Sequence, residues 1–278
     1  MKSIFDDVSL KCSKITTHAY STSFTLGILF LNKRLRAPIY SIYGFVRFAD
    51  EIVDSFHNYD KKTLFESFRQ STAEALRDKI SLNPILNSFQ ATVHRYNIRR
   101  EWIEIFLDSM EMDLYKENYS DVEYKKYIFG SAETVGLMCL HVFVEKDEGL
   151  FEKLKPYAMK LSAAFQKVNF LRDIQADNKE LGRTYFPGVD LKNFSPQAKE
   201  KLEREIECDF KEALKGIKLL PASSRNGVYL SYYYYSVLLK KIKQMPPHRL
   251  LDQRIRVPNF QKIILMIELG VRHQLNLL

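Results

Sequence analysis

Two stretches of the chain place charged and aromatic side chains at helical spacing. In the first, Tyr43, Arg47, Asp50 and Asp54 stand at i, i+4, i+7 and i+11, the steps that return to one face of an α-helix. Like charges one turn apart destabilise an isolated helix by roughly 0.2–0.5 kcal/mol, and unpaired carboxylates cost more when they are buried. This face predicts a positively charged partner. Oxygen ligands one turn apart suit a hard divalent cation, above all Mg2+, that bridges to a substrate phosphate.

A second stretch repeats the pattern. Its polar face, at i, i+3, i+7 and i+11, consists of Gln166, Asn169, Asp173 and Asp177. Arg172 flanks this face, and the segment 182–187, which contains Arg183, follows it. One acidic pair alone is most often surface charge, but both pairs here lie in apolar-rich segments beside arginines. Together they predict two helices that face each other across a cavity and hold metal ions that clamp a diphosphate.

Other parts of the chain give weaker signals. Ser21, Thr22 and Ser23 stand where a helix gives way to a loop. Two roles fit them: they form caps and turns, or their hydroxyl and N–H groups cradle a diphosphate. The tyrosine run 232–235 indicates core packing. The six histidines have no metal-ligand spacing, and no dinucleotide fingerprint is present. We therefore expect no nicotinamide cofactor.

The composition limits the classes of protein that fit. A net charge of +8, from 42 Lys and Arg against 34 Asp and Glu, is dispersed along the 278 residues without a nucleic-acid signature. It is compatible with a diphosphate substrate and with weak attraction to anionic lipid. No linker or low-complexity segment interrupts the chain, so we expect one domain over residues 1–278.

The cysteines and the apolar runs indicate the cellular compartment of the protein. Cys12, Cys139 and Cys208 are far apart and odd in number, which points to a reducing compartment. The first seven residues lack the apolar stretch of a signal peptide, so we expect none, and no run reaches the roughly 20 apolar residues that span a bilayer. We expect a cytoplasmic protein.

The apolar pattern is helical nearly throughout and contains no convincing strand. Cap signals occur at Asp60, Asn83, Ser120 and Ser195. We expect the first acidic helix to begin near Pro38 and the second near Pro156, and a last helix over about 258–275. The fold class predicted is all-α, with about ten helices around a central cavity.

These motifs resemble the paired aspartate-rich signatures of the squalene and phytoene synthase family, the head-to-head prenyl transferases. The first signature matches Tyr43, Arg47, Asp50 and Asp54. The second, Q-x-x-N-x-x-R-D-x-x-x-D followed by G-R-x-Y-F-P, matches positions from Gln166 to Asp177 and from Gly182 to Pro187. The resemblance extends over most of the chain. It includes a substrate-cradling segment at Tyr20 to Phe24, a mid-chain helix at Tyr127 to Gly136, and a late tyrosine and arginine at Tyr235 and Arg256.

The resemblance implies an isoprenoid-synthase-type helical bundle and a set of site residues. Metal ligands would be Asp50, Asp54, Asn169, Asp173 and Asp177, with Mg2+ as the ion and Mn2+ as the alternative. Substrate-binding residues would be Tyr20, Ser21, Thr22, Ser23, Tyr43, Arg47, Gln166, Arg172, Arg183, Tyr235 and Arg256. Tyr43 and Arg47 would also take part in catalysis with the four aspartates.

The implied reaction joins two prenyl diphosphates head to head. The closest resemblance is to bacterial phytoene synthases, which implies that two geranylgeranyl diphosphates give phytoene in carotenoid biosynthesis. Three alternatives stay open: the C15 reaction to squalene or dehydrosqualene, a non-catalytic helical relative, and a head-to-tail prenyl transferase or terpene cyclase. Because the product is insoluble, peripheral association with the inner face of a membrane is a further expectation.

Two positions depart from the resemblance. Glu51 follows Asp50 where many relatives have a second Asp, which keeps the charge on a longer arm. Glu133 stands where relatives usually have Gly in the mid-chain helix.

Overall fold

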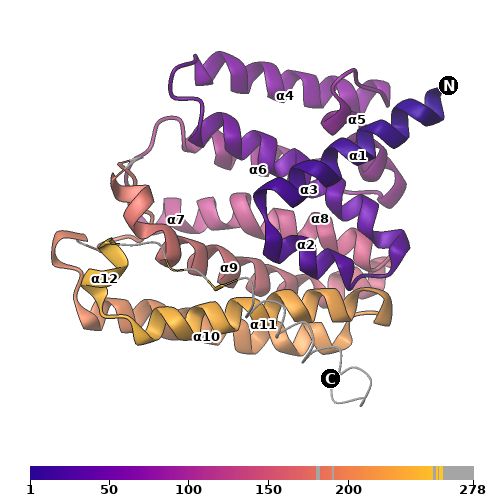
Figure 1. Cartoon of the computed structure of the whole chain (residues 1–278). Helices are drawn as coiled ribbons and strands as arrows, with labels where there is room; N and C mark the ends of the chain where they lie inside the picture. The colour runs from indigo at the N-terminus through magenta and orange to yellow at the C-terminus, as the bar shows by residue number, and fades with distance from the viewer. Residues whose placement is uncertain (180–181, 190, 253–254, 256, 259–278) are drawn as a thin grey trace.

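Helices make up most of the described chain. The computed structural model describes residues 1–278 apart from 180–181, 190, 253–254, 256 and 259–278 (Figure 1). In the described residues the only strand-like pairing is a single bridge between Asn118 and Thr184. The all-α prediction is confirmed. The helices are α1 (Lys2–Tyr20), α2 (Thr22–Leu29), α3 (Lys33–Asp54), α4 (Lys61–Asp78), α5 (Pro84–Tyr96), α6 (Arg100–Met112), α7 (Asp121–Ile128), α8 (Thr134–Phe143), α9 (Glu148–Lys179), α10 (Pro196–Leu219), α11 (Ala222–Gln244) and α12 (Pro247–Asp252), with a π-helical turn η1 (Phe129–Glu133) and a 3-10 turn η2 (Leu191–Asn193).

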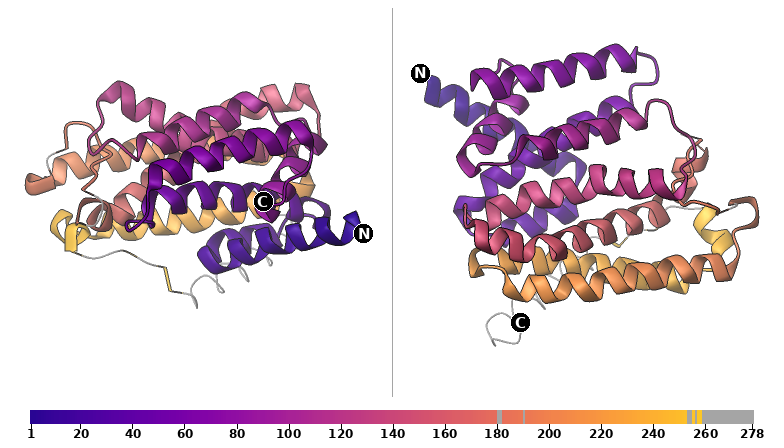
Figure 2. Two further views of the ribbon diagram at one scale, coloured as in Figure 1. Left: turned by 90° about the horizontal axis from the view of Figure 1, so that it is seen from above. Right: turned by 180° about the vertical axis from the view of Figure 1, so that it is seen from behind.

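The long helices lie roughly alongside one another. In Figure 1, α4 lies at the top, α10 and α11 at the bottom, and α9 between them. The view from behind shows the same order of helices from top to bottom (Figure 2). Buried apolar side chains of the long helices other than α1 form one contiguous cluster, whereas the buried residues of α1 are Ser9, Ser13 and Thr17. Within the described ranges, no helix combines the length and the apolar character needed to cross a membrane.

The predicted caps start helices as expected. Asp60 accepts the backbone N–H of Thr63 at the start of α4, and Asn83 accepts that of Ile85 at the start of α5. Ser120 and Glu123 form a complete capping box, which fixes the start of α7. Short polar side chains satisfy backbone donors that a helix start leaves open, and this local chemistry can be recognised in the sequence.

Two helices begin earlier than the sequence indicated. The prediction placed starts near Pro38 and Pro156, but α3 begins at Lys33 and α9 at Glu148. Both prolines lie inside their helices. Each proline removes one backbone hydrogen bond, and the buried faces of these long helices outweigh that loss. The predicted helix over 258–275 lies almost entirely outside the described residues.

The turn η1 joins α7 to α8 into one interrupted helix. Gly130 lies in this turn, and a Cβ atom there would come within 2.6 Å of the Ser109 Cβ atom and 2.8 Å of the Ile105 carbonyl. The side chain of Thr134 donates to the Gly130 carbonyl at 2.6 Å, so the changed backbone pattern keeps a partner for this acceptor. The turn fixes which side chains of α8 face the interior.

Candidate functional site

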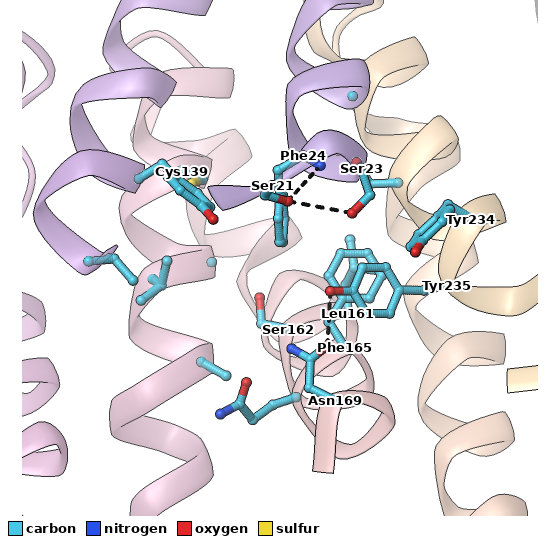
Figure 3. A pocket seen from close by; sticks show the side chains of 18 of the residues that line it. Ser21, Ser23, Phe24, Cys139, Leu161, Ser162, Phe165, Asn169, Tyr234 and Tyr235 are labelled. Carbon is cyan, nitrogen blue, oxygen red and sulfur yellow. Dashed lines mark hydrogen bonds between the residues drawn. The ribbon is translucent and has the colours of Figure 1, made fainter. Parts of the chain in front are cut away.

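A cavity of about 1020 Å³ lies between α2, α3 and the helices from α8 to α11. That is at the upper end of the range for single small-molecule pockets, which is roughly 300–1,000 Å³. Figure 3 shows part of its wall. The predicted site residues that line it are Tyr20, Ser21, Thr22, Ser23, Tyr43, Arg47, Asp50, Asp54, Gln166, Asn169, Arg172, Asp173, Asp177 and Tyr235. The sequence motifs, more than 100 residues apart, therefore meet in one cavity.

Arg47 organises the first acidic face. Its guanidinium donates to Asp50 at 2.6 Å and also to Glu51, and it lies over the ring of Tyr20 at 4.3 Å. Glu51, the residue that departs from the resemblance, thus binds the arginine. The Nε atom of Arg47 is buried and has no hydrogen-bond partner. Because a buried unpaired donor is costly, an acceptor on a bound ligand would satisfy it.

Arg183 connects the first acidic face to the segment that follows the second. It is 6% exposed and donates to Asp54 at 2.7 Å and to the backbone carbonyl of Asp113 at 2.7 Å. Backbone bonds from Arg183 to Asp177 and from Thr184 to Glu117 hold its loop in place. Arg183 does not line the main cavity, so its effect on a ligand passes through Asp54.

Asp113 is a buried carboxylate that sequence reasoning missed. It accepts hydrogen bonds from Tyr127 at 2.6 Å and Tyr119 at 2.9 Å, and Tyr185 lies near the same carboxylate at 3.4 Å. Burial raises the pKa of Asp113 to about 6, although Arg183 opposes the rise. In the sequence, Asp113 is one aspartate between Met112 and Leu114 near the end of a helix. That pattern by itself is weak evidence for a site residue.

The second acidic face lies on α9. Arg172 donates from its Nε atom to Asp173 at 2.9 Å. The hydroxyl of Tyr235 donates to the side-chain oxygen of Asn169 at 3.1 Å, and the Tyr235 ring stacks on Phe165 at 4.1 Å (Figure 3). An amide oxygen has two lone pairs, so Asn169 can accept this bond and still offer an oxygen to a ligand.

Two of the four aspartates have a raised pKa, and burial is the main cause for both. Burial raises the pKa of Asp50 to about 7, with the charge of Asp54 as the next cause. Burial raises the pKa of Asp177 to about 8, and the charges of Asp173 and Asp54 add to it. Asp54 on α3 therefore acts on Asp177 on α9, which shows that the two acidic faces are near each other. Burial and neighbouring carboxylates both disfavour the charged forms of Asp50 and Asp177.

The segment from Ser21 to Ser23 both caps a helix and lines the cavity. Ser21 caps α2 by accepting the backbone N–H of Phe24 at 3.2 Å, and it lies 3.5 Å from the Ser23 hydroxyl. Tyr43 lines the same cavity, and burial raises its pKa to about 12. The start of α2 therefore brings the hydroxyl groups of Ser21 and Ser23 to the cavity wall.

The donor set fits a hard divalent cation shared with a ligand. All the side chains concerned offer carboxylate or amide oxygens, and burial makes a nearby cation favourable for the charged forms of Asp50 and Asp177. Among the described residues, no group of three or more His, Cys, Asp or Glu side chains is close enough to hold one ion alone. Each acidic pair would need further oxygen ligands, such as those of a diphosphate and water. The predicted Arg256 lies outside the described residues.

The geometry defines an all-α protein with two acidic helix faces at one end of a long cavity. The sequence profile of the squalene/phytoene synthase family matches residues 17–261. The chain therefore belongs to the squalene/phytoene synthase family, which is a family of prenyl transferases.

Several curated proteins that resemble this chain are named phytoene synthases. The chain is 29% identical over 262 residues to the chloroplastic phytoene synthase of Narcissus pseudonarcissus, a match that covers 86% of this chain and 60% of that protein. It is 25% identical over 281 residues to the phytoene synthase of Arthrospira platensis, covering 91% and 89%. This chain thus spans about 60% of the length of the plant relative.

Solved structures share the fold at lower identity. A dehydrosqualene synthase in complex with a ligand superposes with a TM-score of 0.81 at 20% identity, over 98% of both chains. The squalene synthase of Alicyclobacillus acidocaldarius gives 0.76 at 20% identity, over 91% of this chain and 97% of that one. These likenesses show the fold.

Proposed function

We propose that this protein is a phytoene synthase, which condenses two geranylgeranyl diphosphates through prephytoene diphosphate to phytoene with release of diphosphate. One observation carries the proposal: two acidic helix faces with their arginines meet at one end of a cavity whose remaining wall is mostly apolar. That arrangement separates a binding region for diphosphates from a region for two prenyl chains. The names of the curated relatives support the C20 substrate.

Asp50, Asp54, Asn169, Asp173 and Asp177 would hold Mg2+, with Mn2+ as the alternative ion. When bound, the ion would neutralise diphosphate charge and favour departure of the leaving group. The reaction needs no nicotinamide cofactor, because formation of phytoene involves no net reduction.

The arginines orient the diphosphates and the acidic side chains. Arg47 has a buried Nε donor without a partner and therefore offers a charge-assisted hydrogen bond to a phosphate oxygen. Arg172 holds Asp173, and Arg183 holds Asp54. With these pairs in place, the carboxylates keep their positions when substrate enters, which lowers the reorganisation needed for reaction.

The aromatic wall would protect the carbocation. The C–O bond of the first substrate breaks, the C2–C3 double bond of the second attacks the allylic cation, and loss of a proton gives prephytoene diphosphate. The rings of Phe24, Tyr43, Phe165 and Tyr235 lie close together in the wall. Aromatic faces stabilise a desolvated cation by about 2 kcal/mol, and an apolar wall excludes the water that would quench it.

A product assay tests this proposal. Purified protein is incubated with geranylgeranyl diphosphate or farnesyl diphosphate and Mg2+, and the extracted hydrocarbon is identified. We expect a C40 triene, and a loss of at least about 100-fold in kcat/KM in Asp50→Ala and in Asp173→Ala. Asp78→Ala is the matched control, because Asp78 is paired with Arg77 on the surface away from the cavity.

A second candidate function is the C15 reaction to squalene or dehydrosqualene. It is favoured by the solved structures, which are named as synthases of those products. A C30 hydrocarbon from farnesyl diphosphate would replace our first proposal with this one. Absence of product from both substrates would favour a non-catalytic role.

A further inference from the structure

Distances along the cavity can be measured along the axis of helix α9, because residues of this helix line the cavity over most of its length. Its lining residues run from Asp177 at the acidic end to Leu154 at the other. An α-helix rises about 1.5 Å per residue, so Ser162 lies roughly 17 Å and Tyr157 roughly 24 Å from Asp173 along the axis. The cavity therefore extends about two turns of helix beyond Ser162.

Small residues form part of the wall of this extension. Ala158 and Ser162 on α9 and Gly136 and Cys139 on α8 all line the cavity. A Cβ atom at Gly136 would come within 2.0 Å of the Ser162 hydroxyl oxygen. Small side chains here let α8 and α9 pack closely and leave the space in front of them to the cavity.

Bulky residues close the cavity beyond this point. The lining there includes Phe143, Leu154, Tyr157 and Leu220, which we call the deep end. Tyr157 is held from behind by α10, because a Cβ atom at Gly216 would come within 2.2 Å of the Tyr157 Cβ atom and 2.7 Å of its Cγ atom. Close packing of α10 onto Tyr157 therefore requires glycine at 216.

The length of a prenyl chain can be compared with the distances from Asp173 to Ser162 and to Tyr157 along α9. A carbon–carbon bond of about 1.5 Å advances an extended chain by roughly 1.3 Å. The twelve-carbon backbone of a farnesyl group then reaches at most roughly 14 Å, and the sixteen-carbon backbone of a geranylgeranyl group roughly 20 Å, by the same bond length. With the diphosphate between the first carbon and Asp173, a farnesyl chain ends near the level of Ser162. A geranylgeranyl chain ends near Tyr157.

We propose that Tyr157, held by Gly216, is the stop that sets the longest prenyl chain the cavity accepts, and that the space beside Cys139 and Ala158 takes the fourth isoprene unit of a geranylgeranyl chain. The inference rests on the proposed function for the position of the diphosphate. It goes beyond that function because it assigns chain-length selection to residues at the end of the cavity opposite the aspartates.

The test measures kcat/KM for farnesyl, geranylgeranyl and farnesylgeranyl diphosphates in three variants. Tyr157→Ala opens the deep end, so we expect its kcat/KM for the C25 substrate, relative to the C20 substrate, to rise at least about tenfold. Tyr157→Phe keeps the ring and should keep the wild-type ratio. Cys139→Phe fills the last part of the cavity, so the ratio of C20 to C15 activity should fall at least about tenfold.

A binding measurement separates this inference from the proposed function. Dissociation constants of unreactive prenyl thiolodiphosphates of the three lengths, measured with Mg2+, should change in the same order as the kinetic ratios. Tyr59→Ala is the control, since Tyr59 is 70% exposed outside the cavity, and circular dichroism verifies that each variant is folded. Unchanged ratios in both folded Tyr157→Ala and Cys139→Phe would overturn the inference. Length-dependent binding without any hydrocarbon product would instead overturn the proposed function alone.

Discussion

At the scale of single residues, Arg183 links two carboxylates at the ends of different helices. It donates to Asp54 at the end of α3 and lies 3.8 Å from the carboxylate of Asp113, which follows α6. Asp113 is 3% exposed at its side chain. Removal of the guanidinium would leave a buried carboxylate without its cation, and such losses cost about 3–5 kcal/mol.

We therefore expect Arg183→Ala to lower the free energy of unfolding by about 3 kcal/mol or more, measured by urea denaturation. Arg183→Lys keeps a charge but not the forked geometry, and should fall between wild type and alanine. The matched control is Arg77→Ala, which removes an exposed arginine and should change the free energy by less than about 0.5 kcal/mol. Equal effects in the two alanine variants would contradict this role.

Glu133 gives a prediction about pH. Burial raises its pKa to about 7, while Lys160 and Lys167 nearby oppose the rise. The folded protein thus holds this proton more tightly than the unfolded chain does, so the free energy of unfolding due to Glu133 falls as the pH rises from about 4.5 to about 7. The full effect is up to about 3 kcal/mol.

The variant Glu133→Gln removes this titration. Urea denaturation between pH 4.5 and pH 8 should show a flatter profile for Glu133→Gln than for wild type, and the variant should be the more stable of the two at pH 8. Parallel profiles over this range would show that Glu133 does not titrate there.

The site residues could be predicted where they repeat along one helix. Asp50 and Asp54, or Asp173 and Asp177, share a face through local periodicity alone, and the cavity contains all four. Asp113 could not be found in this way. Its partners Tyr119, Tyr127 and Tyr185 come from separate segments, and only tertiary packing brings them together.

At the scale of elements, helices α2 and α11 pack backbone against backbone. A Cβ atom at Gly227 would come within 2.5 Å of the Gly27 carbonyl and 2.5 Å of the Leu31 side chain. The carbonyl belongs to the backbone of α2 and cannot rotate away. Any side chain at 227 must therefore move α2, which begins beside Ser21 and Ser23.

We expect Gly227→Ala to destabilise the protein by about 1–3 kcal/mol and to raise KM for the prenyl diphosphate several-fold. The matched control is Gly149→Ala in the first turn of α9, where an added Cβ atom meets only the Asp147 carboxylate at 3.5 Å. That change should stabilise the helix by about 0.5–1 kcal/mol and leave KM unaltered. Denaturation curves and steady-state kinetics measure both. A wild-type KM in Gly227→Ala would show that α2 does not position the substrate.

Helix starts were predictable where a side chain caps them and less so where a proline suggested a start. The caps at Asp60 and Ser120 depend on atoms within three residues. Pro38 and Pro156 were misleading, because tertiary burial keeps α3 and α9 continuous through them. Local chemistry fixes the first kind of boundary, whereas the whole core decides the second.

At the scale of the whole molecule, the cavity has a polar end and an apolar end. The aspartates and arginines gather where α3 and α9 end, and the opposite wall is aliphatic, aromatic or small. A ligand that binds only the folded state stabilises it in proportion to the logarithm of its concentration over its dissociation constant.

We therefore expect Mg2+ and inorganic diphosphate together to raise Tm by about 5 °C or more at saturating concentration, and to do so more than either alone. The shift should be absent in the double variant Asp50→Ala, Asp173→Ala and present in Asp78→Ala. Differential scanning calorimetry makes the measurement. An equal shift from diphosphate without Mg2+ would show that the arginines bind it without a metal ion.

The turn η1 decides which side of α8 faces the cavity. A π-helical turn accommodates one residue more than an α-helix of the same rise. If the same five residues, Phe129–Glu133, formed regular α-helix, everything after them would be rotated by about 100° about the helix axis. Gly136 and Cys139 would then turn away from the cavity. Loss of one residue from the turn would restore regular helix without this rotation, so a single-residue deletion here should leave the register of α8 and its part of the cavity wall in place.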